Sequence, residues 1–484
     1  MSFKKTFFKN ISSFAIYRYI SQGLEFLSTI ILSRLLLPEE YGFVAIILVF
    51  SGFVQLFSDV GLGASVVRSD YGYTFHRHLY SLSVWLGMFL ALIMMGMAYP
   101  IAYFFDNEAL ILPTILISLR FIFDAFTYIP YAILSKKLMF KSIGIANLFG
   151  TGFQIIFTII LAALGFSYWS LIFPLVLGPL FQLIYLRRKV KIPFRLYGIR
   201  ATLRTMRKIR SLMGHLTISK LVSYWSGNAD KVIVGRFYSE ADLGLYNRAF
   251  RFIMIATKLI TGIFSIVLLP SLKKLLTENG DANKEYLDIL KIITLFNMPV
   301  ILILLLFPSE LVLILWGKKW QGVSVFLPYI AIILLFKSML QTTSPVYILY
   351  RKERNMTIVN FVNSALTIAL VLIGGLFSIM HIISFITLGI IVISLPLHIF
   401  FGFYKSFGFR KGVLVKFWVP VMLIGLGLFT SVHFDNYTLR IILLVGYNFM
   451  LIFSLRNTIS EFLQYGLNML MKKNKNTDTN MEDS

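Results

Sequence analysis

The sequence predicts an all-helical protein that crosses a membrane about fourteen times, and three observations support this fold class. Of its 484 residues, 57% are hydrophobic and 14% are charged, whereas a soluble domain carries about 25% charged residues. Apolar stretches of roughly 20 residues, the length that spans a bilayer core, follow one another from about residue 11 to about residue 457. The basic residues between these stretches are unevenly distributed. No room is left for a soluble catalytic domain of ordinary size.

The apolar stretches are separated by short loops that are charged or rich in turn-forming residues. We expect spans at about residues 11–33, 43–66, 79–104, 110–134, 142–164, 168–187, 212–234, 243–269, 288–308, 324–350, 356–376, 379–403, 413–432 and 437–456. The N-terminal MSFKKTFFKN runs into the first of these without a cleavage-site pattern. We therefore interpret it as the start of the first helix rather than as a removed signal.

Lysine and arginine gather in the loops on one side of the predicted membrane. That side carries the N-terminal lysines and the basic segment 187–210, whereas the other side has little beyond Lys318, Lys319 and the borderline Arg34, Arg236 and Arg440. This asymmetry predicts a multi-pass protein with both termini in the cytoplasm. The net charge of +24 then reflects topology, and no nucleic-acid partner is expected. Segment 187–210 could also lie on anionic lipid headgroups.

Signatures of catalysis are missing from the sequence. There is no Walker loop, HExxH or GxSxG motif, no cysteine, and only six scattered histidines. We therefore predict that the chain is not an enzyme and holds no metal or other cofactor. Without an ATP-binding motif, any transport would be driven by an ion gradient, the membrane potential or the substrate gradient.

Two similar corners indicate an internal duplication. SRLLLPEEYG (33–42) and GRFYSEADLG (235–244) each pass from an apolar run through an arginine and an acidic turn to a glycine. A shift of 202 aligns Arg34 with Arg236 and Gly42 with Gly244. A second shift of 215 aligns Leu112, Pro113, Phe121, Pro130, Ile133, Leu134 and Lys137 with Leu327, Pro328, Phe336, Pro345, Ile348, Leu349 and Lys352.

The duplication predicts two six-helix lobes in the same orientation, which is the parallel repeat found in transporters that work by alternating access. Each lobe would carry one corner at its outer mouth. The expected organisation is a first lobe at 1–190, a basic cytoplasmic linker at 191–211, a second lobe at 212–405, two further spans at 406–457 and a polar cytoplasmic tail at 458–484.

Cations dominate the charged residues within the predicted spans. Charges at this depth are costly and usually face a cavity or a partner. The candidates for an anion-binding cavity are Lys220, Arg251, Lys258, Lys337, Arg120 and Arg18. Because arginine offers a bidentate fork to phosphate and lysine a point charge, these residues favour a phosphate-bearing substrate. For Arg248, Lys231 and Arg236, the alternative is that their long side chains reach the outer interface.

Three carboxylates within the spans could couple transport to protons or sodium ions, namely Glu25, Asp59 and Asp124. A buried carboxylate can exchange a proton, although packing against a neighbouring arginine or backbone amide is an equally simple role. Asp124 lies four residues after Arg120, close enough for the two charges to neutralise each other along a helix. The pair is therefore either a structural ion pair or part of a ligand site.

Four segments resemble a known family. LSRLLLPEEYGFVAI (32–46), YIPYAILSKKLMFKSIGIAN (128–147), NADKVIVGRFYSEADLGLYNRAFRF (228–252) and LWGKKWQGVSVFLPYIAI (315–332) are similar to segments of the bacterial polysaccharide transporter family. That family includes Wzx-type flippases and colanic-acid exporters, in the superfamily of multidrug/oligosaccharidyl-lipid/polysaccharide exporters. The resemblance covers about residues 10–405, and none of the candidate residues is carried over from it.

The resemblance implies a flippase of the cell inner membrane that moves undecaprenyl-pyrophosphate-linked oligosaccharides during capsule, exopolysaccharide or O-antigen assembly. Its partners would be the lipid-linked oligosaccharide, the bilayer and the polysaccharide polymerase and chain-length machinery. One alternative is a cation-coupled multidrug exporter, which predicts a cavity dominated by Asp and Glu. Another is a membrane-embedded glycan polymerase or ligase, which would be expected to have a large outer loop.

Overall fold

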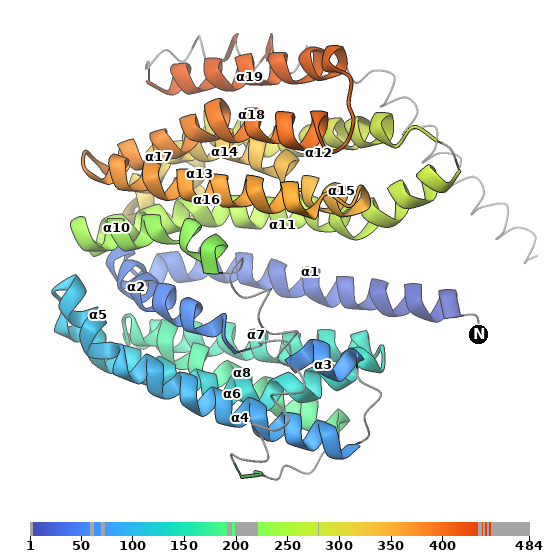
Figure 1. Cartoon of the computed structure of the whole chain (residues 1–484). Coiled ribbons are helices and arrows are strands. Elements are labelled where there is room, and N and C mark those ends of the chain that lie inside the picture. Colours follow the sequence, from blue (N-terminus) through green and yellow to red (C-terminus); the bar gives the residue numbers. More distant parts are fainter. Residues whose placement is uncertain are drawn as a thin grey trace, which may run out of the picture. The chain divides into compact units, whose positions relative to one another are not determined.

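The computed structural model describes residues 3–58, 62–68, 73–190, 196–198, 221–278 and 280–433, together with isolated residues further on (Figure 1). For some helical residues, among them 3–15 and 258–267, the backbone alone is described. Every regular element in these ranges is helical, and nine of the described helices are long and apolar enough to cross a membrane. The predicted class of an all-helical polytopic membrane protein is therefore confirmed.

The chain divides into two compact units that do not follow the sequence order. The first contains Met1–Ala249, Val312–Ser324 and Asn360–Ile382, and the second contains Phe250–Leu311, Val325–Val359 and Ile383–Ser484. Helices α11 (Glu240–Thr277), α13 (Pro308–Leu315), α16 (Glu353–Gly375) and α17 (Ile379–Gly389) contribute residues to both units. The predicted lobes at 1–190 and 212–405 remain a prediction.

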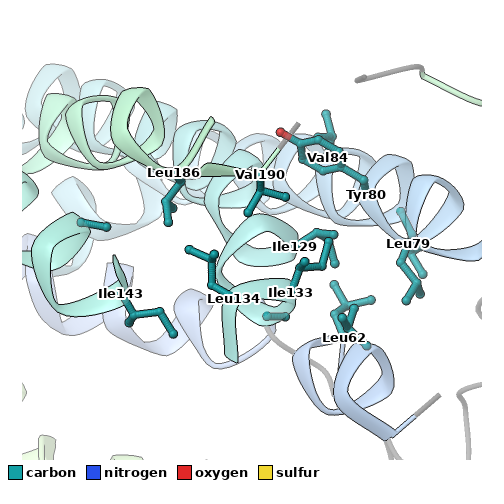
Figure 2. Close-up of a cluster of buried hydrophobic side chains, with 14 residues drawn as sticks. Leu62, Leu79, Tyr80, Val84, Ile129, Ile133, Leu134, Ile143, Leu186 and Val190 are labelled. Atoms are coloured by element: carbon teal, nitrogen blue, oxygen red, sulfur yellow. The ribbon is translucent and has the colours of Figure 1, made fainter. Parts of the chain in front are cut away.

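The first unit is built mainly from the N-terminal helices. They are α1 (Phe3–Leu35), α2 (Pro38–Gln55), α3 (Leu62–Arg68), α4 (Tyr73–Gly96), α5 (Ala98–Phe105), the short η1 (Glu108–Leu110), α6 (Ile111–Lys136), α7 (Phe140–Ala163), α8 (Trp169–Lys189), α10 (Ala229–Phe237) and η2 (Lys318–Val325). Their core forms where α3, α4, α6, α7 and α8 meet (Figure 2). Branched aliphatic residues such as Leu79, Ile129 and Leu186 are fully buried there.

Small residues allow the helices of the first unit to approach closely. A β-carbon at Gly87 of α4 would lie 2.7 Å from the carbonyl oxygen of Phe121 on α6. One turn earlier, Ser83 donates a hydrogen bond of 2.8 Å to the carbonyl oxygen of Ala125. Gly144 of α7 likewise lies against Tyr17 of α1. Small residues and hydroxyl bonds are typical of helix packing in membranes, where apolar side chains alone do not drive association.

The second unit contains α12 (Ala282–Leu306), α14 (Leu327–Leu340), α15 (Thr343–Leu349), the π-helical η3 (Ile390–Ser394), α18 (Leu395–Leu397), the π-helical η4 (His398–Tyr404) and α19 (Lys411–His433). An aromatic core holds these helices together. Phe403 of η4 stacks on Tyr286 and meets Trp418 of α19 edge-on at 5.1 Å. The first of the two predicted additional spans, α19, therefore packs into this unit.

Three predicted spans are interrupted. The span expected at 79–104 divides between α4 and α5, the one at 324–350 divides between α14 and α15, and the one at 379–403 contains two π-helical segments. Pro345 cannot donate a backbone hydrogen bond to Gln341, and α14 ends there, although α6 continues through the equivalent Pro130. The π-helical segments flank Pro396, whose missing N–H disturbs the regular ladder in the same way.

Candidate functional site

Most of the predicted intramembrane cations that the structure describes lie at accessible positions on their helices. Arg18 on α1, Arg251 on α11 and Lys337 on α14 are exposed, and Arg120 on α6 is partly exposed. Lys220 lies outside the described residues, and Lys258 is described by its backbone alone. Arg18 and Arg120 belong to the first unit, whereas Arg251 and Lys337 belong to the second. Charges do not face lipid tails without a large cost, so these positions are suited to a polar space.

Arg248, one helical turn before Arg251, has a different environment. Its side chain is 3% exposed, and its guanidinium lies 4.6 to 4.8 Å from the ring centres of Tyr41, Trp316 and Trp320. It also donates a hydrogen bond of 2.9 Å to the carbonyl oxygen of Thr29. The alternative that Arg248 reaches the interface is therefore wrong, because aromatic faces and a carbonyl hold the cation inside the protein.

The other two residues of that group are held by polar neighbours. Arg236 forms an ion pair with Asp106, and the Nζ of Lys231 donates a hydrogen bond of 2.9 Å to Asn228 Oδ1. Both side chains keep partial exposure. Local polar contacts within the first unit therefore satisfy them.

The three carboxylates considered for ion coupling differ in exposure and in their neighbours. Glu25 on α1 is exposed, and Asp59 lies outside the described residues. Asp124 accepts a bond of 3.2 Å from the Nε of Arg120, with the side chains of Arg120 and Asp124 29% and 13% exposed. The ion pair expected from their i, i+4 spacing is therefore present. Among the described residues, no group of three or more acidic or histidine side chains could hold a metal ion.

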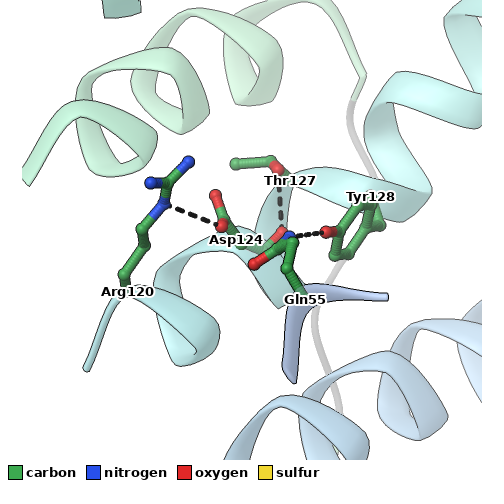
Figure 3. Close-up of polar contacts among 5 residues, drawn as sticks. All are labelled: Gln55, Arg120, Asp124, Thr127 and Tyr128. Atoms are coloured by element: carbon green, nitrogen blue, oxygen red, sulfur yellow. Dashed lines mark hydrogen bonds and ion pairs between the residues drawn. The ribbon is translucent and has the colours of Figure 1, made fainter. Parts of the chain in front are cut away.

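A polar network extends from this ion pair to helix α2 (Figure 3). The amide nitrogen of Gln55, the last residue of α2, donates to the hydroxyl of Tyr128 on α6, and its side chain also hydrogen-bonds to Asp124. Thr127 Oγ1 donates to the Asp124 carbonyl oxygen at 2.8 Å. Because Arg120, Asp124 and Tyr128 recur every four residues, they form one stripe of α6, and Gln55 ties α2 to it.

The two corners identified in the sequence contact each other within the first unit. A β-carbon added at Gly42 would collide with the carbonyl oxygen of Glu240, and one added at Gly244 would collide with that of Pro38. Both pairs of equivalent residues, Pro38 with Glu240 and Gly42 with Gly244, are 202 positions apart. The contact is therefore reciprocal, as two copies of one corner related by a twofold axis would make it. Glycine is required at both positions because the backbones touch.

The two corner arginines bind different segments, the C-terminal end of α13 and the turn after α5. Arg34 donates from Nη2 to the carbonyl oxygens of Leu313 at 3.3 Å and Ile314 at 2.9 Å, while Arg236 pairs with Asp106 after α5. Trp320 Nε1 adds a hydrogen bond of 2.9 Å to the carbonyl oxygen of Ser33. The corner of each copy is thus held by the segment that follows the third span expected in the other copy.

Glu240 is the titratable group at the centre of this contact. The Nδ2 of Asn107 donates a hydrogen bond of 2.6 Å to its carboxylate. Burial raises the pKa of the Glu240 carboxyl above its ordinary value; the bond from Asn107 opposes this shift, and the nearby charge of Glu39 adds to it. The closed contact therefore favours the protonated carboxyl more than water does.

Sequence reasoning recognised the corners but not the aromatic residues around Arg248. WGKKW (316–320) lies between the spans expected at 288–308 and 324–350, yet Trp320 is fully buried and Trp316 nearly so. Two tryptophans in a loop between predicted spans are the signal that could have indicated a buried loop, since large aromatic residues seek buried or interfacial positions.

Comparison with known proteins places this geometry in a family. The model of the family described as "Polysaccharide biosynthesis protein" matches residues 31–325, which include both corners. The chain belongs to this polysaccharide biosynthesis family. The matched residues contain Arg120, Asp124, Arg248 and Arg251, whereas Arg18, Glu25 and Lys337 lie outside the matched range.

Curated relatives are distant and match in part. The succinoglycan biosynthesis transport protein ExoT of Rhizobium meliloti is 22% identical over 65% of this chain and 64% of its own length. The lipopolysaccharide biosynthesis protein WzxC of Escherichia coli is 22% identical over 67% of this chain and 66% of its own length. The teichuronic acid biosynthesis protein TuaB of Bacillus subtilis is 24% identical over 58% of each chain. Each match thus spans less than two thirds of the relative.

Solved structures share the fold along most of the chain. The lipid II flippase MurJ in an inward closed conformation superposes with a TM-score of 0.70 at 15% identity, covering 92% of this chain and 99% of that one. A multidrug resistance MATE transporter of the MOP superfamily, in an inward-facing conformation, gives a TM-score of 0.66 at 15% identity and covers 84% and 99%. The family member described here therefore shares the fold of these two transport proteins.

Proposed function

We propose that this family member is a flippase that translocates undecaprenyl-pyrophosphate-linked oligosaccharide repeat units across the inner membrane by alternating access. Membership of the polysaccharide biosynthesis family supports the class of substrate, and relatives named for succinoglycan transport and lipopolysaccharide biosynthesis support it further. The translocated repeat unit would be used in capsule, exopolysaccharide or O-antigen assembly. The polysaccharide polymerase and the chain-length machinery would act on it next.

One observation carries this proposal, namely the contrast between two arginines on α11. Arg248 is enclosed by three aromatic rings and a carbonyl, whereas Arg251 is exposed three residues later. An exposed guanidinium at membrane depth is costly unless it meets an anion or water. A pyrophosphate headgroup offers several charged oxygens that match the guanidinium fork. Lys337, which belongs to the same unit as Arg251, would supply further positive charge.

The corner contact suggests how access alternates. With both termini in the cytoplasm, as the distribution of basic loops favours, the two corners lie on the periplasmic side. Their reciprocal contact would then close the periplasmic exit. Opening it would separate Gly42 from Glu240 and Gly244 from Pro38.

Reconstituted flipping tests the proposal. We expect wild-type protein to move a polyprenyl-pyrophosphate oligosaccharide to the far leaflet of proteoliposomes. A variant carrying Arg251→Gln with Lys337→Gln should lose at least about tenfold in rate, since a hydrogen bond to a charged group contributes about 1.5–3 kcal/mol. Lys318→Gln with Lys319→Gln removes the same charge from exposed residues of η2 and should have no effect.

Two results would count against this function. Equal rates in the site variant and the matched control would remove the anion-binding role of Arg251 and Lys337. If the wild-type protein moved no more substrate than protein-free vesicles with several glycan donors, the flippase proposal itself would be wrong. The multidrug exporter would then have to be tested with cationic substrates, although Asp124, its best-placed carboxylate in the first unit, is already paired with Arg120.

A further inference from the structure

The ion pair between Arg120 and Asp124 on α6 engages only part of the Arg120 guanidinium. The contact is a single bond from Nε to Asp124 Oδ2 at 3.2 Å. In the part of the chain that the structure describes, no hydrogen bond from either terminal nitrogen to the carboxylate accompanies it. Among the described residues, Asp124 is the one recorded partner of this side chain. The fork that binds a carboxylate or phosphate bidentately is therefore not engaged by Asp124.

The bond is also long for a charge-assisted one. Such bonds between nitrogen and oxygen are usually about 2.7–2.9 Å, and the i, i+3 pair of Asp288 and Lys291 on α12 shows 2.6 Å. Arg120 keeps 29% exposure, whereas Asp124 has 13%. The cation is thus the accessible partner and the carboxylate the buried one. An incoming anion would meet Arg120 first.

Asp124 would not be left without partners if Arg120 turned away. Its side chain also hydrogen-bonds to Gln55, and Gln55 is held in turn by the hydroxyl of Tyr128. A buried carboxylate that loses its counter-charge is normally very costly. Hydrogen bonds from neutral donors reduce that cost. Gln55 and Tyr128 therefore make the separation of the ion pair feasible.

We propose that Asp124 is an internal counter-anion that occupies Arg120 in the absence of substrate and is displaced from it by the pyrophosphate of the substrate. This inference rests on the flippase function proposed above. Pyrophosphate binds the terminal nitrogens of Arg120. The guanidinium then separates from Asp124, which keeps its hydrogen bond with Gln55. After transfer, the return of Asp124 to Arg120 competes with the headgroup and promotes its release.

Competition between Asp124 and pyrophosphate for Arg120 lowers the affinity for the substrate and raises the rate of its release. If a protein binds its substrate more tightly without also binding the transition state more tightly, the substrate concentration needed for half-saturation falls. The maximal rate does not rise. Removing the competitor should therefore strengthen binding of the headgroup and slow its release. A purely structural ion pair predicts the reverse, because its loss would loosen α6 and weaken both binding and transport.

The test measures binding of farnesyl pyrophosphate to the purified full-length protein in detergent, together with flipping in proteoliposomes. We expect Asp124→Asn, which keeps the shape of the side chain, to bind the probe about tenfold more tightly, as the loss of one competing charged hydrogen bond implies. Its flipping rate at saturating substrate should fall. In an Arg120→Gln background, the same substitution at Asp124 should change neither quantity.

Asp288→Asn serves as the matched control because it removes a carboxylate from a helical ion pair of similar burial, and it should leave affinity for the probe unchanged. Asp124→Ser is the second variant if Asp124→Asn does not fold, as judged by its melting temperature. If the wild-type protein binds the probe and both Asp124 variants bind it equally or more weakly, the counter-anion role of Asp124 would be overturned. The proposed flippase function would not be affected by this result. Absence of probe binding in every form would overturn both.

Discussion

Replacing Gly42 by alanine separates the effect of the corner contact from every other property of α2. The new methyl group would collide with the carbonyl oxygen of Glu240 when the two corners are in contact. When they are apart, the substitution changes only a helical glycine into a better helix former. The perturbation therefore acts selectively against the closed arrangement.

The expected size follows from two opposing contributions. Overpacking a tight contact costs about 1–3 kcal/mol, and this cost applies only while the corners touch. Alanine gains about 1 kcal/mol over glycine inside a helix, but that gain is the same whether the corners touch or not. The ratio of open to closed corners should therefore rise by about 5- to 150-fold.

A single cysteine can report this ratio because the natural chain contains none. Leu243 lies beside Gly244 in the opposite corner and has 0% exposure. A thiol introduced at Leu243 should react with a membrane-impermeant maleimide only while the corners are apart. Phe237, with 71% exposure, provides a reference thiol that reacts in either arrangement. We expect Gly42→Ala to accelerate labelling at position 243 and not at position 237.

Gly96→Ala is the matched control, since a β-carbon at the end of α4 has nothing within 4 Å. It should leave labelling at both positions unchanged. The reasoning would be refuted if Gly42→Ala and Gly96→Ala gave the same labelling rate at position 243. That outcome would mean that the two backbones do not approach as closely as the structure has them, or that the corners never separate.

Two further predictions concern Glu240 and Arg248. Because burial raises the pKa of Glu240 in the closed corner, its contribution to closure is complete below the ordinary pKa and is lost as pH rises through the raised value. Labelling at position 243, normalised to position 237, should therefore accelerate as the pH rises through the raised pKa of Glu240, above the ordinary range of a glutamate carboxyl, and Glu240→Gln should remove this dependence. Arg248→Lys should lower the free energy of unfolding by at least about 2 kcal/mol, measured by denaturant titration in detergent, because lysine cannot stack on three rings. It should leave binding of farnesyl pyrophosphate unchanged; weaker binding at unchanged stability would instead give Arg248 a role at the substrate.

Much of the candidate site follows from the order of residues along single helices. The spacing of Arg120 and Asp124 predicts their ion pair, because residues four apart share a helix face, and the structure contains it. The repeated corner was recognised from one chain because duplication leaves equal residues at a fixed shift. The network from Asp124 to Gln55 was not predicted, since Gln55 belongs to another helix and spacing says nothing about neighbours across a helix interface.

The sequence by itself determined that this is a polytopic membrane protein and that one corner occurs twice. These properties depend on the hydrocarbon thickness and on local periodicity, which act on each segment separately. Only the tertiary structure decided that the corners touch at their glycines and that Arg248 is enclosed while Arg251 is exposed. The partners of Arg248 come from residues 29, 41, 316 and 320, and a periodic pattern on α11 contains no information about which distant segments will pack against it.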